Sequence, residues 1–250
     1  MMTENTALLE IHNLDKSFGG VKAVDNVTMS MRAGIVTTLV GPNGAGKTTL
    51  FNLITGNLPR DGGTVTWLGR EIAGIKPHQA ARRGILRSYQ DLRLFDGMSV
   101  YENVLGAVEQ NALPLPMSRV AQRNRRDHIE HVLSRAGLAD KRSERAVDLA
   151  YAERKFLSLA RIMATQAKLW LLDEPASGLD PSSYERFLSI LREDVAGGVT
   201  VCIIEHNLDI VIGISDRIAF LDRGKLLAEG DPKTIMNDPA LARIYFGDQE

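Results

Sequence analysis

The chain is poor in several residue types, and each shortage excludes a class of protein. Its 250 residues include one cysteine, Cys202, so no internal disulfide can form. The 30 lysines and arginines nearly balance the 31 aspartates and glutamates. This balance gives no general electrostatic reason to bind nucleic acid, so we expect no nucleic-acid partner.

Long apolar runs are also missing. The longest, such as residues 169–172 and 210–212, are far shorter than the roughly 20 residues that cross a bilayer. The N-terminus has Glu4 and no apolar run behind a basic start, which does not match a secretion signal. We expect a soluble, cytoplasmic protein whose membrane function, if it has one, depends on separate partner chains.

The remaining composition is that of a globular protein with a substantial core. Hydrophobic residues make up 44% of the chain and charged residues 24%, which excludes disordered and collagen-like chains. At roughly 150 residues per domain, the length allows one large domain or two closely associated ones.

Hydrophobic periodicity predicts an α/β protein. Val27, Met29 and Met31 alternate with polar residues, so we expect strands over residues 7–33 and both methionines in the core. Residues 35–40 are predicted to form a strand and residues 48–54 a helix. A hairpin is expected over 64–72 and a helix over 77–84. The next helix would start with a capping box of Ser99 and Glu102 and end before Pro114 and Pro116. The remaining expected elements are helices through 129–137 and 156–163, a strand at 169–172, a helix at 181–191, a strand at 201–204, a helix at 207–214, and strands near 218–221 and 226–228.

The order of these elements predicts a helical segment inserted into an α/β core. Residues 1–90 and 166–250 would form the core around a mostly parallel sheet, and residues 91–165 would form the helical part. We expect residues 1–250 to make up a single domain of this kind.

A glycine-rich loop follows the strand predicted at 35–40. Its sequence, Gly-Pro-Asn-Gly-Ala-Gly-Lys-Thr, matches the pattern G-x-x-x-x-G-K-[ST]. Glycines let backbone N–H groups face an anion, and the following helix points its positive end at that anion. Lys47 would reach the β- and γ-phosphates, and the Thr48 hydroxyl would bind Mg²⁺. The residues expected to bind the nucleotide here are Gly41, Asn43, Gly44, Ala45, Gly46, Lys47, Thr48 and Thr49.

Two carboxylates follow the buried strand predicted at 169–172. Ligand sites in open α/β sheets lie at this edge of the sheet. Asp173 would hold Mg²⁺ through its water shell, and Glu174 would orient and deprotonate the attacking water. Strands that end in acidic residues are common, so this assignment depends on the presence of the phosphate loop.

Taken together, the motifs resemble those of the ATP-binding cassette ATPases, and the resemblance covers nearly the whole chain. The matching segments occur in the family's order: residues 41–48, Gln90, residues 149–153, residues 173–175, residues 177–180 and His206. The resemblance implies the ABC ATPase fold, which is an α/β P-loop NTPase (RecA-like) core with an N-terminal antiparallel β-subdomain and an inserted α-helical subdomain carrying residues 149–153. It also implies ATP hydrolysis, with ATP and Mg²⁺ as cofactors.

The resemblance further assigns roles to single residues. Phe18 matches the aromatic that stacks on adenine, with a core phenylalanine as the alternative. Gln90 matches the glutamine that contacts Mg²⁺ and water, and His206 matches the switch histidine that hydrogen-bonds to the γ-phosphate. Asp180 matches the acid that links two nucleotide sites across a dimer, and it also suits an N-cap. The implied catalytic residues are Lys47, Gln90, Glu174 and His206, and the implied metal ligands are Thr48, Gln90 and Asp173.

One segment departs from the family pattern. The usual L-S-G-G-Q is replaced by Leu149-Ala150-Tyr151-Ala152-Glu153. The serine hydroxyl that would meet the γ-phosphate of the opposing subunit is absent at Ala150, although the helix that follows still presents N–H groups to an anion. We expect a weakened contact with the partner's ATP and an unaffected phosphate loop.

The L-A-Y form resembles the Liv-type subgroup, which powers uptake of branched-chain amino acids. Residues 93–103, 204–216 and 237–247 agree with this subgroup, whereas Ala152 departs from it. The resemblance implies transmembrane permease subunits, a second ATP-binding subunit, an indirect solute-binding partner and a peripheral position on the inner face of the membrane. Urea and amide importers are similar. Identical and mixed pairs of subunits both remain open, and the altered signature favours the mixed pair.

Three other functions fit the sequence less well. A soluble cassette ATPase acting on ribosomes or DNA would usually carry two cassettes or a long coiled-coil insert, and neither is present. A non-catalytic subunit would account for Ala150 and Ala152, but Glu174 and His206 are retained. A nucleotide kinase shares only the phosphate loop. The basic stretch over 119–145 is more often a solvated helix face than a contact with anionic lipid.

Overall fold

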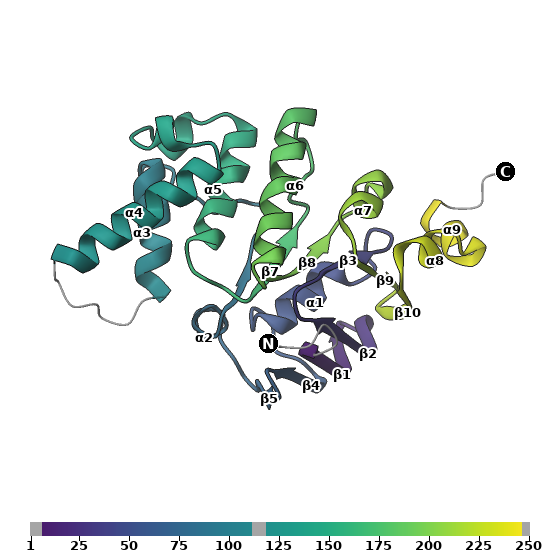
Figure 1. Ribbon diagram of the computed structural model, residues 1–250. Coiled ribbons are helices and arrows are strands. Elements are labelled where there is room, and N and C mark those ends of the chain that lie inside the picture. Colours follow the sequence, from purple (N-terminus) through teal and green to yellow (C-terminus); the bar gives the residue numbers. More distant parts are fainter. Residues whose placement is uncertain (1–6, 112–118, 247–250) are drawn as a thin grey trace.

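The computed structural model describes residues 7–111 and 119–246. Within these residues, two β-sheets are combined with helices (Figure 1). Figure 1 shows the smaller sheet at the bottom. At one end of the molecule lie helices α3 (Val100–Asn111), α4 (Arg119–Arg135) and α5 (Tyr151–Met163), and at the other end lie α8 (Pro232–Met236) and α9 (Pro239–Phe246).

The larger sheet has six strands in the order β10-β9-β3-β8-β7-β6. Neighbouring strands from β9 to β6 run parallel, and β10 is antiparallel to β9. The mostly parallel sheet predicted from the sequence is therefore confirmed. Its strands are β3 (Val36–Val40), β6 (Ile85–Arg87), β7 (Leu169–Asp173), β8 (Thr200–Ile204), β9 (Arg217–Asp222) and β10 (Lys225–Gly230).

The smaller sheet is antiparallel, in the order β2-β1-β4-β5. Strands β1 (Ala7–Phe18) and β2 (Val21–Arg32) form a long hairpin, and β4 (Gly62–Trp67) and β5 (Arg70–Glu71) form the predicted second hairpin. Met29 and Met31 are buried and Thr28 is exposed, so the predicted alternation is confirmed.

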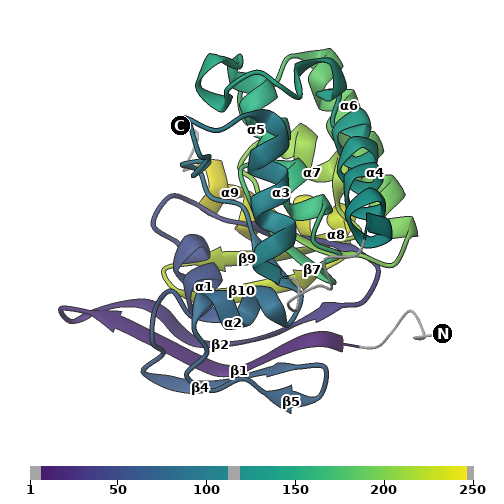
Figure 2. The same ribbon diagram turned by 90° about the vertical axis from the view of Figure 1, so that its left-hand side faces the viewer.

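Helix α1 (Lys47–Ile54) lies between the two sheets (Figure 2). Its buried residues pack in one cluster with Leu9 and Ile11 of β1 and with Leu171 of β7. This cluster connects the smaller sheet to the larger one through the helix that follows the phosphate loop.

The opposite face of the larger sheet is covered by helices. Trp170 and Leu172 alternate with the residues that face α1, and they belong to a second core. That core includes side chains of α3 (Val100–Asn111), α4 (Arg119–Arg135), α5 (Tyr151–Met163) and α6 (Pro181–Ala196), with the 3₁₀ segments η1 (Ala139–Lys141) and η2 (Ala146–Asp148) between α4 and α5.

The capping box predicted before α3 is present. The Glu102 carboxylate accepts the Ser99 N–H at 2.8 Å, and the Ser99 Oγ accepts the Glu102 N–H at 3.2 Å. Each side chain thereby satisfies a backbone donor that the helix leaves without a partner, which fixes the start of α3.

Short helices complete the fold. Helix α2 (Pro77–Arg82) precedes β6, and helices α7 (Leu208–Ile214), α8 (Pro232–Met236) and α9 (Pro239–Phe246) lie near β9. A third buried cluster joins Ile218 and Phe220 of β9 to Ile235 and Leu241 of the last two helices.

Most of the predicted elements are confirmed. Strand β6, helices α8 and α9 and the 3₁₀ segments η1 and η2 are absent from the prediction, and the helix predicted at 181–191 extends to Ala196. Pro114 and Pro116, which were expected to end a helix, lie outside the described residues. In the part of the chain that the structure describes, no helix is both long and apolar enough to span a bilayer.

Replacing Ile54 by alanine is expected to lower the free energy of unfolding by about 2–5 kcal/mol. Ile54 is fully buried in the cluster that joins the two sheets, so the substitution leaves a cavity. Urea denaturation followed by circular dichroism measures the change. Val21→Ala, at a side chain that is 69% exposed, should change stability by less than about 0.5 kcal/mol. Equal losses in both variants would contradict this core.

Candidate nucleotide-binding site

The phosphate loop over residues 41–48 is held close to neighbouring backbone. A Cβ on Gly41 would lie 1.9 Å from the Leu221 carbonyl oxygen, and one on Gly46 would lie 2.2 Å from the Ala23 carbonyl oxygen. Both glycines also have positive φ angles, 148° and 99°. Larger residues therefore fit neither the space nor the backbone conformation. The contacts place the loop at the N-terminus of α1, whose first N–H groups have no acceptor within the helix.

The other predicted phosphate-loop residues differ in exposure. Asn43, Gly44 and Thr48 are exposed, Thr49 is half-buried, and Ala45 is buried. The Thr48 hydroxyl is therefore accessible to a ligand at the start of α1. The buried Ala45 anchors the loop, because its carbonyl oxygen accepts the Gly224 N–H at 3.0 Å.

The Lys47 ammonium folds back over its own loop. Its Nζ donates to the carbonyl oxygens of Gly41 at 2.6 Å and Pro42 at 3.0 Å. Burial lowers the pKa of Lys47, and the carboxylates of Glu174 and Asp173 oppose this effect. The ammonium thus lies in the field of both acidic residues, where a phosphate oxygen can replace the two carbonyls as acceptor.

Asp173, at the end of β7, forms a buried ion pair. Its Oδ2 lies 3.0 Å from Arg87 Nη2, and the two side chains are 2% and 4% exposed. Burial raises the pKa of Asp173, and the hydrogen bond from Arg87 opposes that rise. The guanidinium also donates to the Asn52 side chain of α1 at 2.5 Å, so it connects β7 to the helix of the phosphate loop.

The residues around Asp173 fit Mg²⁺ bound together with a nucleotide. Asp173 Oδ1 is buried and has no hydrogen-bond partner among the described residues. Those residues contain no cluster of three or more His, Cys, Asp or Glu side chains that could hold a metal by themselves. Mg²⁺ usually binds through one or two carboxylates plus substrate phosphates and water. Asp173 and the Thr48 hydroxyl therefore suit a metal that arrives with the nucleotide.

Glu174 and His206 meet at the ends of neighbouring strands. Strands β7 and β8 pair in parallel, with Asp173 opposite Ile204, and the Glu174 N–H donates to the Ile204 carbonyl oxygen at 3.0 Å. His206 Nδ1 lies 3.6 Å from Glu174 Oε1. The His206 side chain is 59% exposed and that of Glu174 is 29% exposed, so a water and a phosphate can reach both. The structure therefore brings together Lys47, Asp173, Glu174 and His206, as the sequence predicted.

Gln90 lies beyond β6, exposed, in the wall of a cavity of about 320 Å³. Asp173, Glu174, Tyr151 and Lys155 line the same cavity. Within the described part of the chain Gln90 makes no hydrogen bond, so its role at the metal stays a prediction.

Phe18, at the end of β1, is 47% exposed. It is therefore not the core phenylalanine that was the alternative to an adenine-stacking residue. Lys16 Nζ lies 5.4 Å from the centre of the ring. An exposed ring beside a cation can stack on a purine base, and this role remains a prediction.

Asp180 caps helix α6. Its Oδ1 accepts the backbone N–H groups of Ser182 at 3.0 Å and Ser183 at 3.1 Å. The hydroxyls of Ser183 and Ser182 also donate to this carboxylate, and they hold its pKa well below the usual range. Asp180 thus has the capping role, and its role across a dimer stays a prediction.

The altered signature segment leads directly into α5. Ala150 is the N-cap residue and supplies no side-chain hydrogen bond. The Glu153 carboxylate accepts the Ala150 N–H at 2.9 Å, and Lys141 Nζ lies 2.8 Å from Glu153 Oε1. The acid that replaces the usual glutamine therefore belongs to a local ion pair.

Sequence reasoning missed three charged residues around the site: Arg87, Lys155 and Glu205. Glu205 is 1% exposed at the end of β8, and an acid directly after the apolar run 201–204 was the available signal. Arg87 lies in a strand that was not predicted. Lys155 carries no local signal, because its partners lie about 20 residues away in the chain.

Comparisons with known proteins agree with this geometry. The family model for the ABC transporter matches residues 24–177. The high-affinity branched-chain amino acid transport ATP-binding protein LivG of Salmonella typhimurium is 39% identical, with 96% of this chain and 98% of that protein covered. The chain belongs to the ABC transporter family. The ATP-binding protein BraF of Pseudomonas aeruginosa, which has the same description, is 34% identical over the same shares of the two chains.

A solved structure extends the likeness to the ABC fold. The ADP conformation of an ATP-binding cassette of an ABC transporter matches with a TM-score of 0.86 and 31% identity, covering 98% of this chain and 100% of that chain. The expected ABC ATPase fold and the class of enzyme, an ATP-hydrolysing cassette, are thereby confirmed. The roles of individual site residues stay predictions.

Lys47→Ala is expected to weaken ATP binding by roughly ten- to a hundredfold, because it removes a charged hydrogen-bond donor worth about 1.5–3 kcal/mol. Titration of the purified chain with a fluorescent ATP analogue measures the affinity. The matched control is Lys233→Ala, at an exposed lysine of α8, which should leave affinity unchanged. Unchanged affinity in Lys47→Ala would show that the loop does not hold the phosphates.

Proposed function

We propose that the chain is the ATP-binding and ATP-hydrolysing subunit of a membrane ABC importer, and that it drives a separate permease. It would lie on the inner face of the membrane as a peripheral subunit. The observation that carries the proposal is the convergence of the phosphate loop, Asp173, Glu174 and His206 at one edge of the sheet, in a chain that matches LivG over nearly its whole length.

The geometry supports a separate role for each of these residues in ATP hydrolysis. Lys47 would neutralise charge on the β- and γ-phosphates, and His206 would hydrogen-bond to the γ-phosphate. Glu174, 3.6 Å from His206, would orient and deprotonate the attacking water. When bound, Mg²⁺ would neutralise the charge that develops on the phosphate oxygens, with Thr48, Gln90 and Asp173 as its protein ligands. Phe18 would stack on the adenine.

The proposal includes a second ATP-binding subunit. ATP would close two subunits head to tail, with each nucleotide between one phosphate loop and the other chain's segment 149–153, and with Asp180 near the contact between the two sites. The second subunit is either another copy or a sister ATPase. The altered segment supports the mixed pair, because a sister with an intact signature can serve the ATP bound to this chain.

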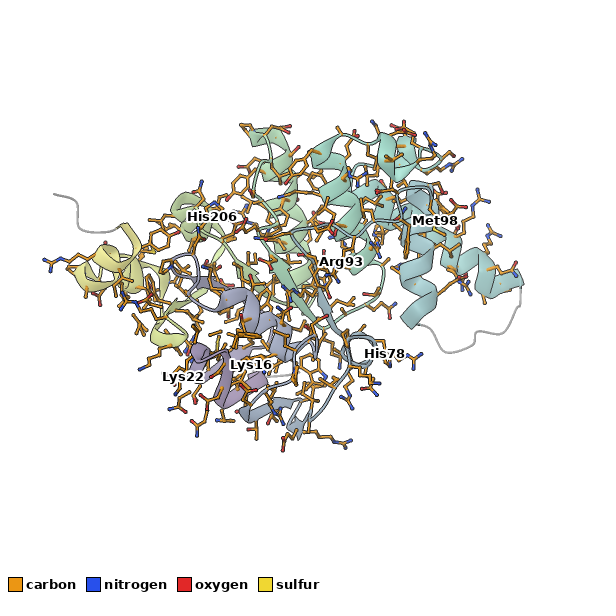
Figure 3. The ribbon with its side chains drawn as sticks, turned by 180° about the vertical axis from the view of Figure 1, so that it is seen from behind. Lys16, Lys22, His78, Arg93, Met98 and His206 are labelled. Atoms are coloured by element: carbon orange, nitrogen blue, oxygen red, sulfur yellow. The ribbon has the colours of Figure 1, made fainter. Side chains whose placement is uncertain are left out.

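An exposed apolar patch supports a permease partner. Phe95, Met98 and Val147 are 41%, 46% and 51% exposed. They lie together, since the Ala146 N–H donates to the Met98 carbonyl oxygen and the Met98 N–H to that of Phe95. Figure 3 shows Met98 on the helical side of the molecule, away from His206. Such a patch suits docking of an apolar helix from a partner.

The proposed division of the chain into a core and a helical part assigns the nucleotide and the partner contacts to different segments. Residues 1–90 and 166–250 would bind and hydrolyse the nucleotide, while residues 91–165 would carry both the patch and the altered signature. Closure of the dimer would pass to the permease through the loop after Gln90.

Branched-chain or other hydrophobic amino acids are the proposed cargo. LivG and BraF are both described as high-affinity branched-chain amino acid transport proteins, and their likeness to this chain is the support. The permease and a solute-binding protein, rather than this chain, would recognise the cargo. A urea or amide importer is the alternative.

Glu174→Gln is expected to bind ATP with normal affinity and to hydrolyse it at least a hundredfold more slowly, because the amide cannot accept the proton of the attacking water. Single-turnover hydrolysis by the complex reconstituted in vesicles measures the rate. Glu185→Gln removes a carboxylate on α6 and serves as the control. Normal turnover in Glu174→Gln would overturn the assignment of the base.

Isolation of the tagged chain from native membranes tests the partners and the cargo class. We expect co-purification with permease subunits and a second ATP-binding subunit. We also expect the complex in vesicles to take up branched-chain amino acids when ATP is supplied. Uptake of urea instead would select the alternative importer. Recovery with ribosomes or DNA, and without membrane subunits, would overturn the importer role.

A further inference from the structure

The segment 174–177 follows the buried strand β7 and starts in a sparsely populated conformation. Glu174 has φ of +48°, in the left-handed region that residues with a side chain rarely adopt. Such a conformation costs on the order of 1–3 kcal/mol and persists where the surrounding structure holds it. The contacts that hold this segment therefore decide where the Glu174 carboxylate lies.

Lys155 holds the segment from one side. Its Nζ donates to the carbonyl oxygens of Glu174 at 2.9 Å and Pro175 at 3.3 Å, and also to that of Ser177. An ammonium has three donors and no acceptor, so three carbonyls satisfy it fully. The side chain is half-buried, and burial lowers the pKa of Lys155 while Glu205 and Glu174 oppose that effect.

Strand β8 holds the same segment from the other side. The Glu205 Oε1 accepts the Ala176 N–H at 3.2 Å. The Ile204 carbonyl oxygen accepts the Glu174 N–H at 3.0 Å. The segment is thus fixed from two sides, with N–H groups bonded to Ile204 of β8 and to Glu205 directly after it, and with carbonyls bonded to Lys155 of α5.

Helix α5 makes a second contact with the adjoining loop. The Tyr151 ring lies 3.1 Å from the position that a Cβ on Gly178 would occupy. Lys155 Nζ lies 5.3 Å from the centre of that ring, one helical turn further along α5. Beside these contacts, the cavity of about 320 Å³ lies between α5 and the Gln90 loop. Side chains are therefore not closely packed between α5 and the Gln90 loop. The connection from α5 to segment 174–177 depends more on the polar contacts of Lys155 for this reason.

From these contacts we infer that Lys155 is a positioning residue for the catalytic carboxylate and that it ties Glu174 to the helix that begins at the altered signature. The inference rests on the proposed function of Glu174. A shift of the N-terminal turn of α5, as when a partner's nucleotide engages it, would pull on three carbonyls of the segment that follows Glu174. Lys155 would thereby make the activity of this chain's own site depend on occupancy of the neighbouring one.

Kinetics of the reconstituted complex test the inference. Lys155→Met keeps the length of the side chain and removes all three donors. We expect kcat to fall roughly tenfold to a hundredfold, because a displacement of about 1 Å can have that effect, while KM for ATP stays unchanged. Lys155→Arg, which restores donors in the same place, should recover most of the lost kcat. Lys168→Met is the matched control at an exposed lysine before β7, and it should behave as wild type.

Hydrogen exchange of the full-length chain gives a readout that does not depend on hydrolysis. In Lys155→Met, the amides of residues 174 and 176–178 should exchange at least tenfold faster, while those of the phosphate loop keep their rates. Wild-type exchange at residues 174 and 176–178, or equal kcat in Lys155→Met and wild type, would overturn the inference. A parallel fall in kcat and rise in KM without rescue by arginine would also overturn it, since that result indicates general damage. Absence of ATP hydrolysis by the wild-type complex would instead overturn the proposed function, and the exchange experiment would still decide whether Lys155 holds the segment.

Discussion

Parallel pairing of β3, β8 and β7 places three strand ends at one level of the molecule. Leu39 of β3 and Asp173 of β7 both pair with Ile204 of β8, so the residues that follow these strands emerge side by side. They are the phosphate loop, Glu174 and the stretch that leads to His206. A slip of one residue in β7 would turn Asp173 to the opposite face of the sheet. The composition of the site therefore depends on the register, which the apolar contacts on both faces of these strands maintain.

The buried ion pair between Asp173 and Arg87 shows how the sheet tolerates a carboxylate in its interior. Burial of an isolated charge is costly, and loss of one partner of a buried pair costs about 3–5 kcal/mol. Arg87 also bonds to Asn52 on α1, and its guanidinium lies 4.9 Å from the centre of the Tyr89 ring. These contacts fix one oxygen of Asp173 and leave Oδ1 without a partner among the described residues. The site is therefore preorganised around a carboxylate with one oxygen already bonded and the other left for a ligand.

Local features of the sequence predicted much of the fold and the centre of the site. Parallel strands covered on both faces are continuous apolar runs, so residues 169–172 and 201–204 were identifiable. The phosphate loop was identifiable because its chemistry lies within eight consecutive residues. Strand β6 has only three residues and shows no period. The bonds from Arg87 to Asp173 and from Lys155 to Ser177 join residues 86 and 22 positions apart, and only the folded chain brings them together.

The altered signature places two opposing effects at the start of α5. A serine at position 150 would accept N–H groups of the first turn, and Ala150 leaves them without that acceptor. An incoming phosphate oxygen could bond to these groups and would be attracted by the helix dipole, equivalent to about half a positive charge. Glu153 brings a full negative charge to the same turn, and Lys141 offsets part of it at 2.8 Å. A neutral glutamine would not repel the phosphate, so we expect the contact made by this chain to be weaker than the usual one. The two nucleotide sites of a dimer would therefore differ in strength unless both subunits carried the same change.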